Sequence, residues 1–359
     1  MVPPVQQSLF ATRQARRYSV PFPSTRYQGS KLKLTEWIWA NVEDLEFDTV
    51  LDLFGGTGCV SHLFKTAGKR VIYNDILLFN WTIGLALIEN RDVRLAPVDI
   101  ELVLERHPGI NYPDFIQRTF SGIYFTDSEN AWLDRVVYNI DHLLADPFKQ
   151  ALARFAVYQA CIAKRPYNLF HRANLYMRQA KVQRSFGNKT TWDTPFEVHF
   201  RAFAIEANAA VFDNERSNRA ICGDALEAPV DVDLVYIDPP YVNHRGVGVD
   251  YLDFYHFLEG LTRYDEWQQR IDYSTKHRRL QRLESPWTRP GTILAAFEAV
   301  IARYRKSILV VSYRNDGIPS QDALIEVLKR YKSNVFEANK RQKYVLSKRD
   351  SAELLLIAL

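Results

Sequence analysis

Residues 49–58 read TVLDLFGGTG, a short apolar run that leads directly into a turn rich in glycine. The pattern predicts a buried strand over Thr49–Phe54, a glycine turn over Gly55–Gly58 and a helix from Cys59 to about Lys65. Strand, glycine turn and helix in this order open a doubly wound sheet, in which glycines let a ligand approach the backbone. We therefore expect an α/β protein with a Rossmann-like sheet.

A second apolar run, Arg70–Asn74, predicts the next strand, which ends at Asp75. An acid at the tip of the second strand, about 20 residues beyond the glycine turn, can bind ribose hydroxyls. The glycines at 55, 56 and 58 do not match Gly-x-Gly-x-x-Gly, and no pyrophosphate cradle is apparent. The sequence therefore favours a nucleoside ligand without phosphate over a nicotinamide dinucleotide.

The remaining apolar runs and the long intervals between them predict the domain organisation. Further strands are expected at Arg219–Cys222, Leu234–Ile237, Ser307–Ser312, Asn334–Ala338 and Leu354–Leu359. Continuous apolar strands are typical of a mostly parallel sheet with helices on both faces. The interval between the second strand and residue 219 is too long for a connection and has helical periodicity. We expect a sheet domain over 1–90 and 216–359, with an insertion over 242–291, and a mostly helical lobe over 91–215.

Composition excludes several classes of protein. The chain has 359 residues, 47% of them hydrophobic, enough for a large core. No apolar run approaches the ~18 residues that span a bilayer, and the N-terminus does not resemble a signal peptide. Cys59, Cys161 and Cys222 lack the paired spacing of a disulfide framework or a zinc site. The sequence therefore predicts a cytoplasmic protein without metal or membrane partner, in which the cysteines are small buried hydrophobes.

Residues 238–241 read Asp-Pro-Pro-Tyr and directly follow the apolar run 234–237. A strand-end acid accepts hydrogen bonds, the carbonyl of Pro239 can offer a second acceptor, and the ring of Tyr241 can stack on a planar heterocycle. Two prolines also stop the strand and stiffen the turn, so the alternative is that the motif only ends a strand. The cluster is suited to holding an amine.

The order of these motifs resembles the adenine-N6 DNA methyltransferases of the alpha group, the Dam-like family. That order is Thr25–Lys31, the Phe54–Gly58 turn, the inserted lobe and then Asp238–Tyr241, and it covers nearly the whole chain. The specific part of the resemblance is the pairing of Phe-Gly-Gly-Thr-Gly with Asp-Pro-Pro-Tyr in one sheet. The lobe would then be the target-recognition lobe of a methyltransferase.

The resemblance implies S-adenosylmethionine as cofactor. The glycine turn would lie beside its methionine part, Asp75 would hold the ribose and Asp224 would meet the adenine amino group. Tyr27 stands where the family commonly has Trp, and Lys31 could instead be a surface residue of a helix over 31–42. The implied cofactor-binding residues are Tyr27, Lys31, Phe54, Gly55, Gly56, Thr57, Gly58, Asp75, Ile76, Asp224, Ala225 and Asp238.

The implied catalytic residues are Asp238, Pro239, Pro240 and Tyr241. The amino nitrogen of adenine shares its lone pair with the ring and is a poor nucleophile. If Asp238 and the Pro239 carbonyl accept both amino hydrogens, the lone pair is directed at the methyl group. Tyr241 would stack on the base, which must first be flipped out of the duplex. The reaction needs neither a cysteine nucleophile nor a metal.

Other segments give weaker signals. The net charge of +4 is mild, but basic and aromatic residues alternate over 13–26, 164–184 and 270–289, as they do on surfaces that bind nucleic acid. Within these, 165–172 and the loop 185–192 suit groove reading, while 276–279 form either a phosphate contact or a solvated helix face. Phe170 and Trp192 are expected in the core. The run 251–258 should pack beside the target pocket, and residues 312–314 could line it.

Three classes of function remain open. The leading hypothesis is a site-specific DNA adenine methyltransferase, bacterial or phage-encoded, that acts on double-stranded DNA. It would modify DNA in a restriction-modification system, with a cognate restriction endonuclease as a possible partner. A cytosine-N4 or RNA adenine methyltransferase has the same fold and cofactor. A catalytically silent DNA-binding protein on this scaffold is the third class, while the glycine spacing disfavours a nicotinamide oxidoreductase.

Overall fold

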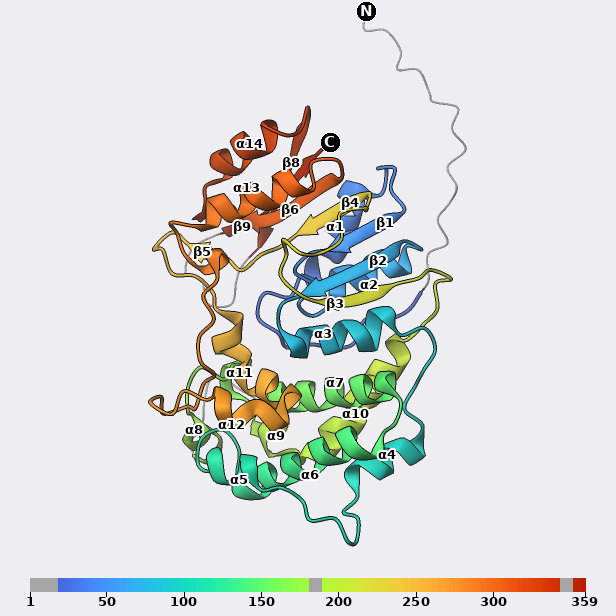
Figure 1. Ribbon diagram of the computed structural model, residues 1–359, viewed down its shortest axis with the longest axis vertical. Helices are drawn as coiled ribbons and strands as arrows, with labels where there is room; N and C mark the ends of the chain where they lie inside the picture. The colour runs from blue at the N-terminus through green and yellow to red at the C-terminus, as the bar shows by residue number, and fades with distance from the viewer. Residues whose placement is uncertain (1–18, 181–188, 343–350) are drawn as a thin grey trace, which may run out of the picture.

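The computed structural model describes residues 19–180, 189–342 and 351–359. Within these residues the centre is a seven-stranded sheet of order β3-β2-β1-β4-β6-β9-β8, drawn in Figure 1 above a layer of helices. Its strands are β1 (Thr49–Asp52), β2 (Arg70–Asp75), β3 (Arg219–Cys222), β4 (Leu234–Ile237), β6 (Ile308–Arg314), β8 (Val335–Gln342) and β9 (Ser351–Ala358). A small separate sheet pairs β5 (Val242–Asn243) with β7 (Gly317–Ile318).

The strand order reverses between β1 and β4. The chain runs outward from β1 through β2 to β3, and then returns to add β4 and β6 on the other side of β1, all in parallel. In an open parallel sheet, ligands bind at the carboxyl ends of the strands where the order reverses. The expected mostly parallel α/β sheet is confirmed, and its reversal point indicates where a site should lie.

The far edge of the sheet is antiparallel, because β9 inserts between β6 and β8 and runs against both. Strands β8 and β9 both extend beyond the apolar runs that predicted them. In their ladder, Lys340 lies opposite Glu353. Backbone pairing does not require apolar side chains, so the hairpin continues into polar sequence. The predicted bounds of these strands were therefore too short at their polar ends.

Alternate residues of the central strands enter two different cores. Val50, Val71 and Tyr236 belong to one core, whereas their neighbours Leu51, Ile72 and Ile237 belong to the other. The first core contains α1 (Thr35–Val42), α2 (Cys59–Thr66) and α3 (Leu78–Gly84), and the second contains α13 (Ile293–Arg303) and α14 (Gln321–Lys329). Helices thus cover both faces of the sheet, as continuous apolar strands predict.

The long interval between β2 and β3 is helical and continues the first core away from the sheet. Figure 1 shows α7 beneath α3, with α10 and α6 beyond it. The helices here are α4 (Pro97–Leu104), α5 (Phe115–Thr119), α6 (Asp127–Leu143), α7 (Pro147–Ala163), α8 (Leu175–Gln179), α9 (Lys189–Asp193) and α10 (Phe196–Ala210). Later insertions add α11 (Tyr251–Thr262) and α12 (Trp267–Arg270) against this layer.

Several local expectations were wrong. The segment 31–42 is split, because a 3₁₀ turn over Leu32–Leu34 precedes α1. Residues 276–279 lie in a loop closed by the Ile271–Leu280 bridge and not on a helix. Cys222 is exposed, because it ends the edge strand β3. Residues 189–192 of the expected 185–192 loop belong to α9, and 185–188 lie outside the described residues, as do 13–18 of the first basic segment.

No helix among the described residues is both long enough and apolar enough to cross a membrane.

Candidate active site

A cavity opens at the carboxyl ends of β1, β2, β3 and β4, where the strand order reverses. Its walls come from the ends of these strands, from Tyr27 and Gly29–Lys31 before α1, and from the start of α11. Residues 283–288, which the sequence placed in a basic stretch typical of nucleic-acid-binding surfaces and not at the cofactor site, form a further wall. The cavity includes every residue of the expected cofactor set except Gly58: Tyr27, Lys31, Phe54, Gly55, Gly56, Thr57, Asp75, Ile76, Asp224, Ala225 and Asp238.

The glycine turn lies against β2 because Gly55 lacks a side chain. Gly55 N donates to the Asn74 carbonyl at 2.8 Å, and a Cβ at Gly55 would lie 2.1 Å from the Tyr73 ring. Gly58 has a φ of +75°, which favours glycine, and it starts α2 without reaching the cavity. Gly58 therefore shapes the turn, while Gly55 and Gly56 form its cavity face.

Asp75 is held in place at the tip of β2. Gly56 N and Leu77 N each donate to its carboxylate at 2.9 Å, and Asn80 Nδ2 donates at 3.1 Å. Burial raises the pKa of Asp75 to about 6, although these donors oppose the shift. A carboxylate offers about four acceptor positions, so one position remains for a ligand hydroxyl.

Another part of the cavity lining suits a planar ring. Ile76 lines the cavity with 57% of its surface exposed, and Asp224 places an exposed carboxylate beside buried Ala225. Trp287, which sequence reasoning missed, lies 4.9 Å from the Phe54 ring in an edge-on contact. An apolar surface next to a hydrogen-bond acceptor is what an adenine ring with an amino group requires.

A buried polar cluster lies at the end of β4. Lys31 Nζ donates to both oxygens of Asp238, at 2.8 and 2.7 Å, and to the Tyr241 hydroxyl at 2.6 Å. The sequence did not indicate the fourth member, Glu353 of β9, whose Oε1 lies 2.7 Å from the Tyr241 hydroxyl. Lys31 is therefore no surface residue, and its side chain is 6% exposed.

The cluster concentrates acidic groups around one ammonium. Burial raises the pKa of Asp238, as does the neighbouring Glu353, whereas Lys31 opposes the shift. Asp52, a buried cavity residue that the sequence treated only as part of a strand, has its pKa raised to about 7 by burial despite the Ser61 hydroxyl at 2.7 Å. The cavity is therefore an environment that favours a positively charged or hydrogen-bond-donating ligand.

Within the Asp-Pro-Pro-Tyr motif, Asp238 and Pro240 line the cavity, and Pro239 is buried beside them. Tyr241 directs its hydroxyl into the cluster, and its ring meets Tyr313 edge-on at 4.9 Å. Ring stacking of Tyr241 on a base stays a prediction. Ser312 and Tyr313 were expected near the target pocket, but both are fully buried and neither lines the cavity.

The N-terminal aromatic residue joins a stack of three tyrosines. Tyr27 lies parallel to Tyr255 at 4.4 Å and to Tyr251 at 5.5 Å. Gln28 N donates to the Tyr255 hydroxyl at 2.8 Å, which fixes the N-terminal segment to α11. Tyr251 and Leu252 line the cavity, so the run 251–258 does pack beside it as expected.

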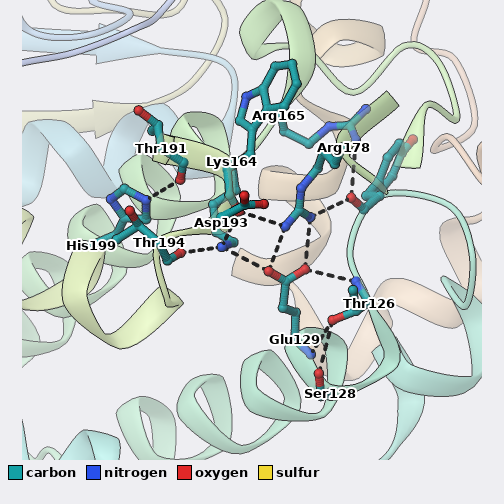
Figure 2. Close-up of polar contacts among 12 residues, drawn as sticks. Thr126, Ser128, Glu129, Lys164, Arg165, Arg178, Thr191, Asp193, Thr194 and His199 are labelled. Atoms are coloured by element: carbon teal, nitrogen blue, oxygen red, sulfur yellow. Dashed lines mark hydrogen bonds and ion pairs between the residues drawn. The ribbon is translucent and has the colours of Figure 1, made fainter. Parts of the chain in front are cut away.

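The basic stretch 164–184 was interpreted as a phosphate-binding surface, and this is wrong for Lys164, Arg165 and Arg178, which are buried. Figure 2 shows Glu129 between Lys164 and Arg178, with Glu129 oxygens 2.9 Å from Lys164 Nζ and 2.7 Å from Arg178 Nη2. Lys164 also donates to the Trp192 carbonyl at 2.8 Å. These cations hold the helical layer together. Phe170 and Trp192 are buried in it, which confirms that prediction.

No group of three histidine, cysteine, aspartate or glutamate side chains among the described residues is arranged to hold a metal ion.

The cavity lies at the strand reversal of a Rossmann-like sheet, and the strand-end acid Asp238 holds the Lys31 ammonium beside it. Residues 27–287 match the model of the D12 class N6 adenine-specific DNA methyltransferases, and the chain belongs to that family. The protein is therefore an adenine-specific DNA methyltransferase. Membership decides against a cytosine-N4 or RNA methyltransferase, a silent DNA-binding protein and an oxidoreductase.

Named relatives match over most of the chain. Type II methyltransferase M2.HphI of Haemophilus parahaemolyticus is 29% identical over 86% of this chain and 88% of its own length. Type II methyltransferase M.NlaIII of Neisseria lactamica is 26% identical over 85% of this chain and 88% of its own length. Type II methyltransferase M.CviAII of Paramecium bursaria Chlorella virus 1 is 21% identical over the same shares.

Proposed function

We propose that the protein transfers a methyl group from S-adenosylmethionine to the N6 amino group of an adenine flipped out of double-stranded DNA, within one specific short sequence. The observation that carries this proposal is the ammonium of Lys31 on both oxygens of Asp238. The Asp238 carboxylate already accepts hydrogen bonds from one nitrogen, the Nζ of Lys31. It can therefore accept them from the amino group of a base.

The residues around the cavity fit the cofactor. Asp75 keeps one acceptor position for a ribose hydroxyl, and the exposed surfaces of Ile76 and Asp224 suit an adenine ring and its amino group. The backbone of Gly55 and Gly56 lines the cavity, and the open space beside Gly56 would take the amino-acid part. When bound, S-adenosylmethionine supplies an electrophilic methyl group on a sulfonium.

The protein's own groups would then orient the acceptor. Asp238 and the Pro239 carbonyl accept the two amino hydrogens, which localises the nitrogen lone pair and aims it at the methyl group. Tyr241 stacks on the base or, through its hydroxyl, fixes the Asp238 carboxylate. After transfer the methylated nitrogen is acidic enough to lose a proton, so Asp238 need not remove one beforehand.

We further propose a division of labour along the chain. Residues 1–90 and 216–359, with the insertion 242–291, would carry catalysis, and the helical lobe 91–215 would recognise the target sequence. The lobe contacts α11, whose first residues line the cavity, through Phe170 N, which donates to the Phe254 carbonyl at 2.9 Å. DNA read by the lobe would therefore lie beside the cavity.

The relatives' names support a role in modification. Several are type II methyltransferases, and others are called modification methylases. We propose that this protein is likewise the modification enzyme of a restriction-modification system with a cognate endonuclease. DNA that it has methylated should resist an endonuclease that cuts at the same sequence, and unchanged cleavage of fully methylated DNA would contradict this role.

A transfer assay tests the proposed chemistry. Purified protein should move label from S-adenosylmethionine into adenine of unmethylated bacterial duplex DNA. Asp75→Asn should weaken cofactor binding about tenfold in a calorimetric titration, because it removes a charged acceptor for the ribose. Glu298→Gln, the same kind of change in an acid on α13 outside the cavity, should leave binding unchanged. Label found only on cytosine or only on RNA would refute the proposal.

A further inference from the structure

Glu353 is a fully buried acid for which the proposed chemistry has no task. It lies on β9, and the Ser312 hydroxyl of β6 donates to its Oε1 at 2.7 Å. The same oxygen lies 2.7 Å from the Tyr241 hydroxyl and 3.4 Å from Lys31 Nζ. A buried carboxylate is costly unless it is paired, so its place beside Asp238 calls for a physical reason.

Three of the about four acceptor positions of Asp238 are already occupied, and Lys31 holds one on each oxygen. Its Oδ1 lies 2.8 Å from both Lys31 Nζ and the Tyr241 hydroxyl, and its Oδ2 lies 2.7 Å from Lys31 Nζ. Lys31 uses its three donors on these two oxygens and on the Tyr241 hydroxyl. An incoming amino group therefore competes with Lys31 for the carboxylate.

The Tyr241 hydroxyl stands between two acids. It lies 2.8 Å from Asp238 Oδ1 and 2.7 Å from Glu353 Oε1, yet it carries only one proton to donate. It can therefore satisfy either carboxylate but not both. Lys31 has the same choice, because a shift of about half an ångström brings its Nζ into hydrogen-bond range of Glu353.

We propose that Glu353 is a positioning residue that receives the Lys31 ammonium and the Tyr241 hydroxyl when the target amine enters, and so frees Asp238 to bind that amine. The inference rests on the proposed function. Lys31 stays paired with a carboxylate before and after the shift, so the exchange leaves no buried cation alone. The Ser312 hydroxyl holds Glu353 Oε1 at the place where both donors can reach it.

A double-mutant cycle tests this role. In Glu353→Gln, Lys31 loses the carboxylate 3.4 Å from its Nζ, keeps Asp238 and blocks the amine more strongly. We expect kcat to fall about 10- to 100-fold, while KM for DNA and the affinity for S-adenosylmethionine stay within about threefold. In a Lys31→Met background the competing ammonium is gone and only the Tyr241 hydroxyl still shifts to Glu353, so Glu353→Gln should cause a clearly smaller fold loss of kcat.

The outcomes are distinct. An equal fold loss in both backgrounds would mean that Glu353 acts independently of Lys31 and would overturn the proposal, as would full activity of Glu353→Gln in an active wild-type background. A wild-type protein without transfer would instead refute the proposed function. Glu298→Gln is the matched control on α13 and should retain wild-type kcat.

A structural measurement on the wild-type protein covers the case in which Glu353→Gln does not fold. In a complex with a target duplex and a non-reactive cofactor analogue, Lys31 Nζ should lie within about 3 Å of Glu353 and should have left at least one oxygen of Asp238. If the base amine is bound and Lys31 still occupies both oxygens of Asp238, the proposal is wrong.

Discussion

Two buried clusters in this protein combine lysine with carboxylates, and they are built in opposite ways. In the helical layer, Lys164 and Arg178 share Glu129, and their remaining donors go to backbone carbonyls such as that of Trp192 (Figure 2). At the cavity, Lys31 is shared by Asp238 and Glu353, with the Tyr241 hydroxyl between the two acids.

The difference lies in the ratio of donors to acceptors. Around Glu129, cations outnumber the acid and rigid carbonyls take the surplus donors, so one arrangement is favoured. Burial raises the pKa of Glu129, but the hydrogen bonds from Arg178 outweigh it and the net shift is downward. Around Asp238, in the part of the chain that the structure describes, two acids meet one ammonium, so the donors have two similar acceptors. The first pattern stabilises a fold, and the second suits a site that must exchange partners.

Asp238→Asn should have the largest effect on activity. The amide removes the negative charge and replaces one acceptor oxygen by a donor, so it holds its amino hydrogen less well beside the Pro239 carbonyl, and kcat should fall about 10³-fold. Stability should change by no more than about 1 kcal/mol, because Lys31 keeps a carboxylate beside it in Glu353, 3.4 Å from its Nζ. Initial rates at saturating cofactor, together with urea denaturation, measure both. Activity within tenfold of wild type would show that Asp238 does not bind the reacting amine.

Glu129→Gln should reverse this pattern. Two buried cations lose their carboxylate, and the free energy of unfolding should fall by about 3–5 kcal/mol. Cofactor affinity of the folded protein should not change, because Glu129 is outside the cavity. Urea denaturation monitored by tryptophan fluorescence gives the first quantity, and calorimetry the second. A loss below about 1 kcal/mol, as expected for an exposed pair, would show that the cluster does not hold the layer together.

Tyr167→Ala should weaken DNA binding without affecting the cofactor. Tyr167 is 52% exposed and has a φ of 63°, a conformation that L side chains rarely adopt. Arg165 stabilises this turn, because it donates to the carbonyls of Leu169 and Arg172. We expect Kd for target DNA to rise about tenfold through lost stacking on a base. Phe336→Ala, which removes a ring of similar exposure on β8, is the control; equal affinities of all three proteins would refute a DNA contact at Tyr167.

His62→Gln should have the smallest effect. It changes only how the free energy of unfolding depends on pH, and it involves a residue outside both clusters. Burial lowers the pKa of His62 from 6.5 to about 4. Below pH ~6.5 the unfolded chain binds this proton and the folded chain does not, so the contribution of His62 is present above that pH and is lost as pH falls through ~4.

Between pH 7.5 and 5, wild type should therefore lose about 2 kcal/mol more than His62→Gln, as a comparison of urea denaturation curves would show. Asp52, whose pKa burial raises to about 7, contributes with the opposite sign in both proteins and cancels in the difference. Equal losses in the two proteins would show that His62 does not carry this dependence.

Local sequence patterns predicted one half of the cavity well. The glycine turn, Asp75, Asp224 and Asp238 all follow short apolar runs, and parallel strands bring their carboxyl ends to one edge. A residue that ends a strand can be predicted from the few residues before it. Their meeting at one edge needed no long-range information beyond the rule that parallel strands end together.

The other half depends on register and on distant partners. Glu353 meets Tyr241 across 112 residues because β9 inserts antiparallel between β6 and β8, which no local pattern indicates. The sequence shows only that Glu353 directly precedes the apolar run Leu354–Leu359. Arg178 looked like a surface cation because its partner Glu129 lies 49 residues earlier. Charge alone does not reveal burial when the neutralising group comes from another helix.

Long-read sequencing of DNA from a host that expresses the gene tests the central claim most directly. Wild type should place N6-methyladenine at every copy of one short sequence, and the Asp238→Asn gene should leave the same copies unmodified. Modified cytosines, or methylated adenines that follow no common sequence, would contradict the assignment of this cavity to a specific flipped adenine.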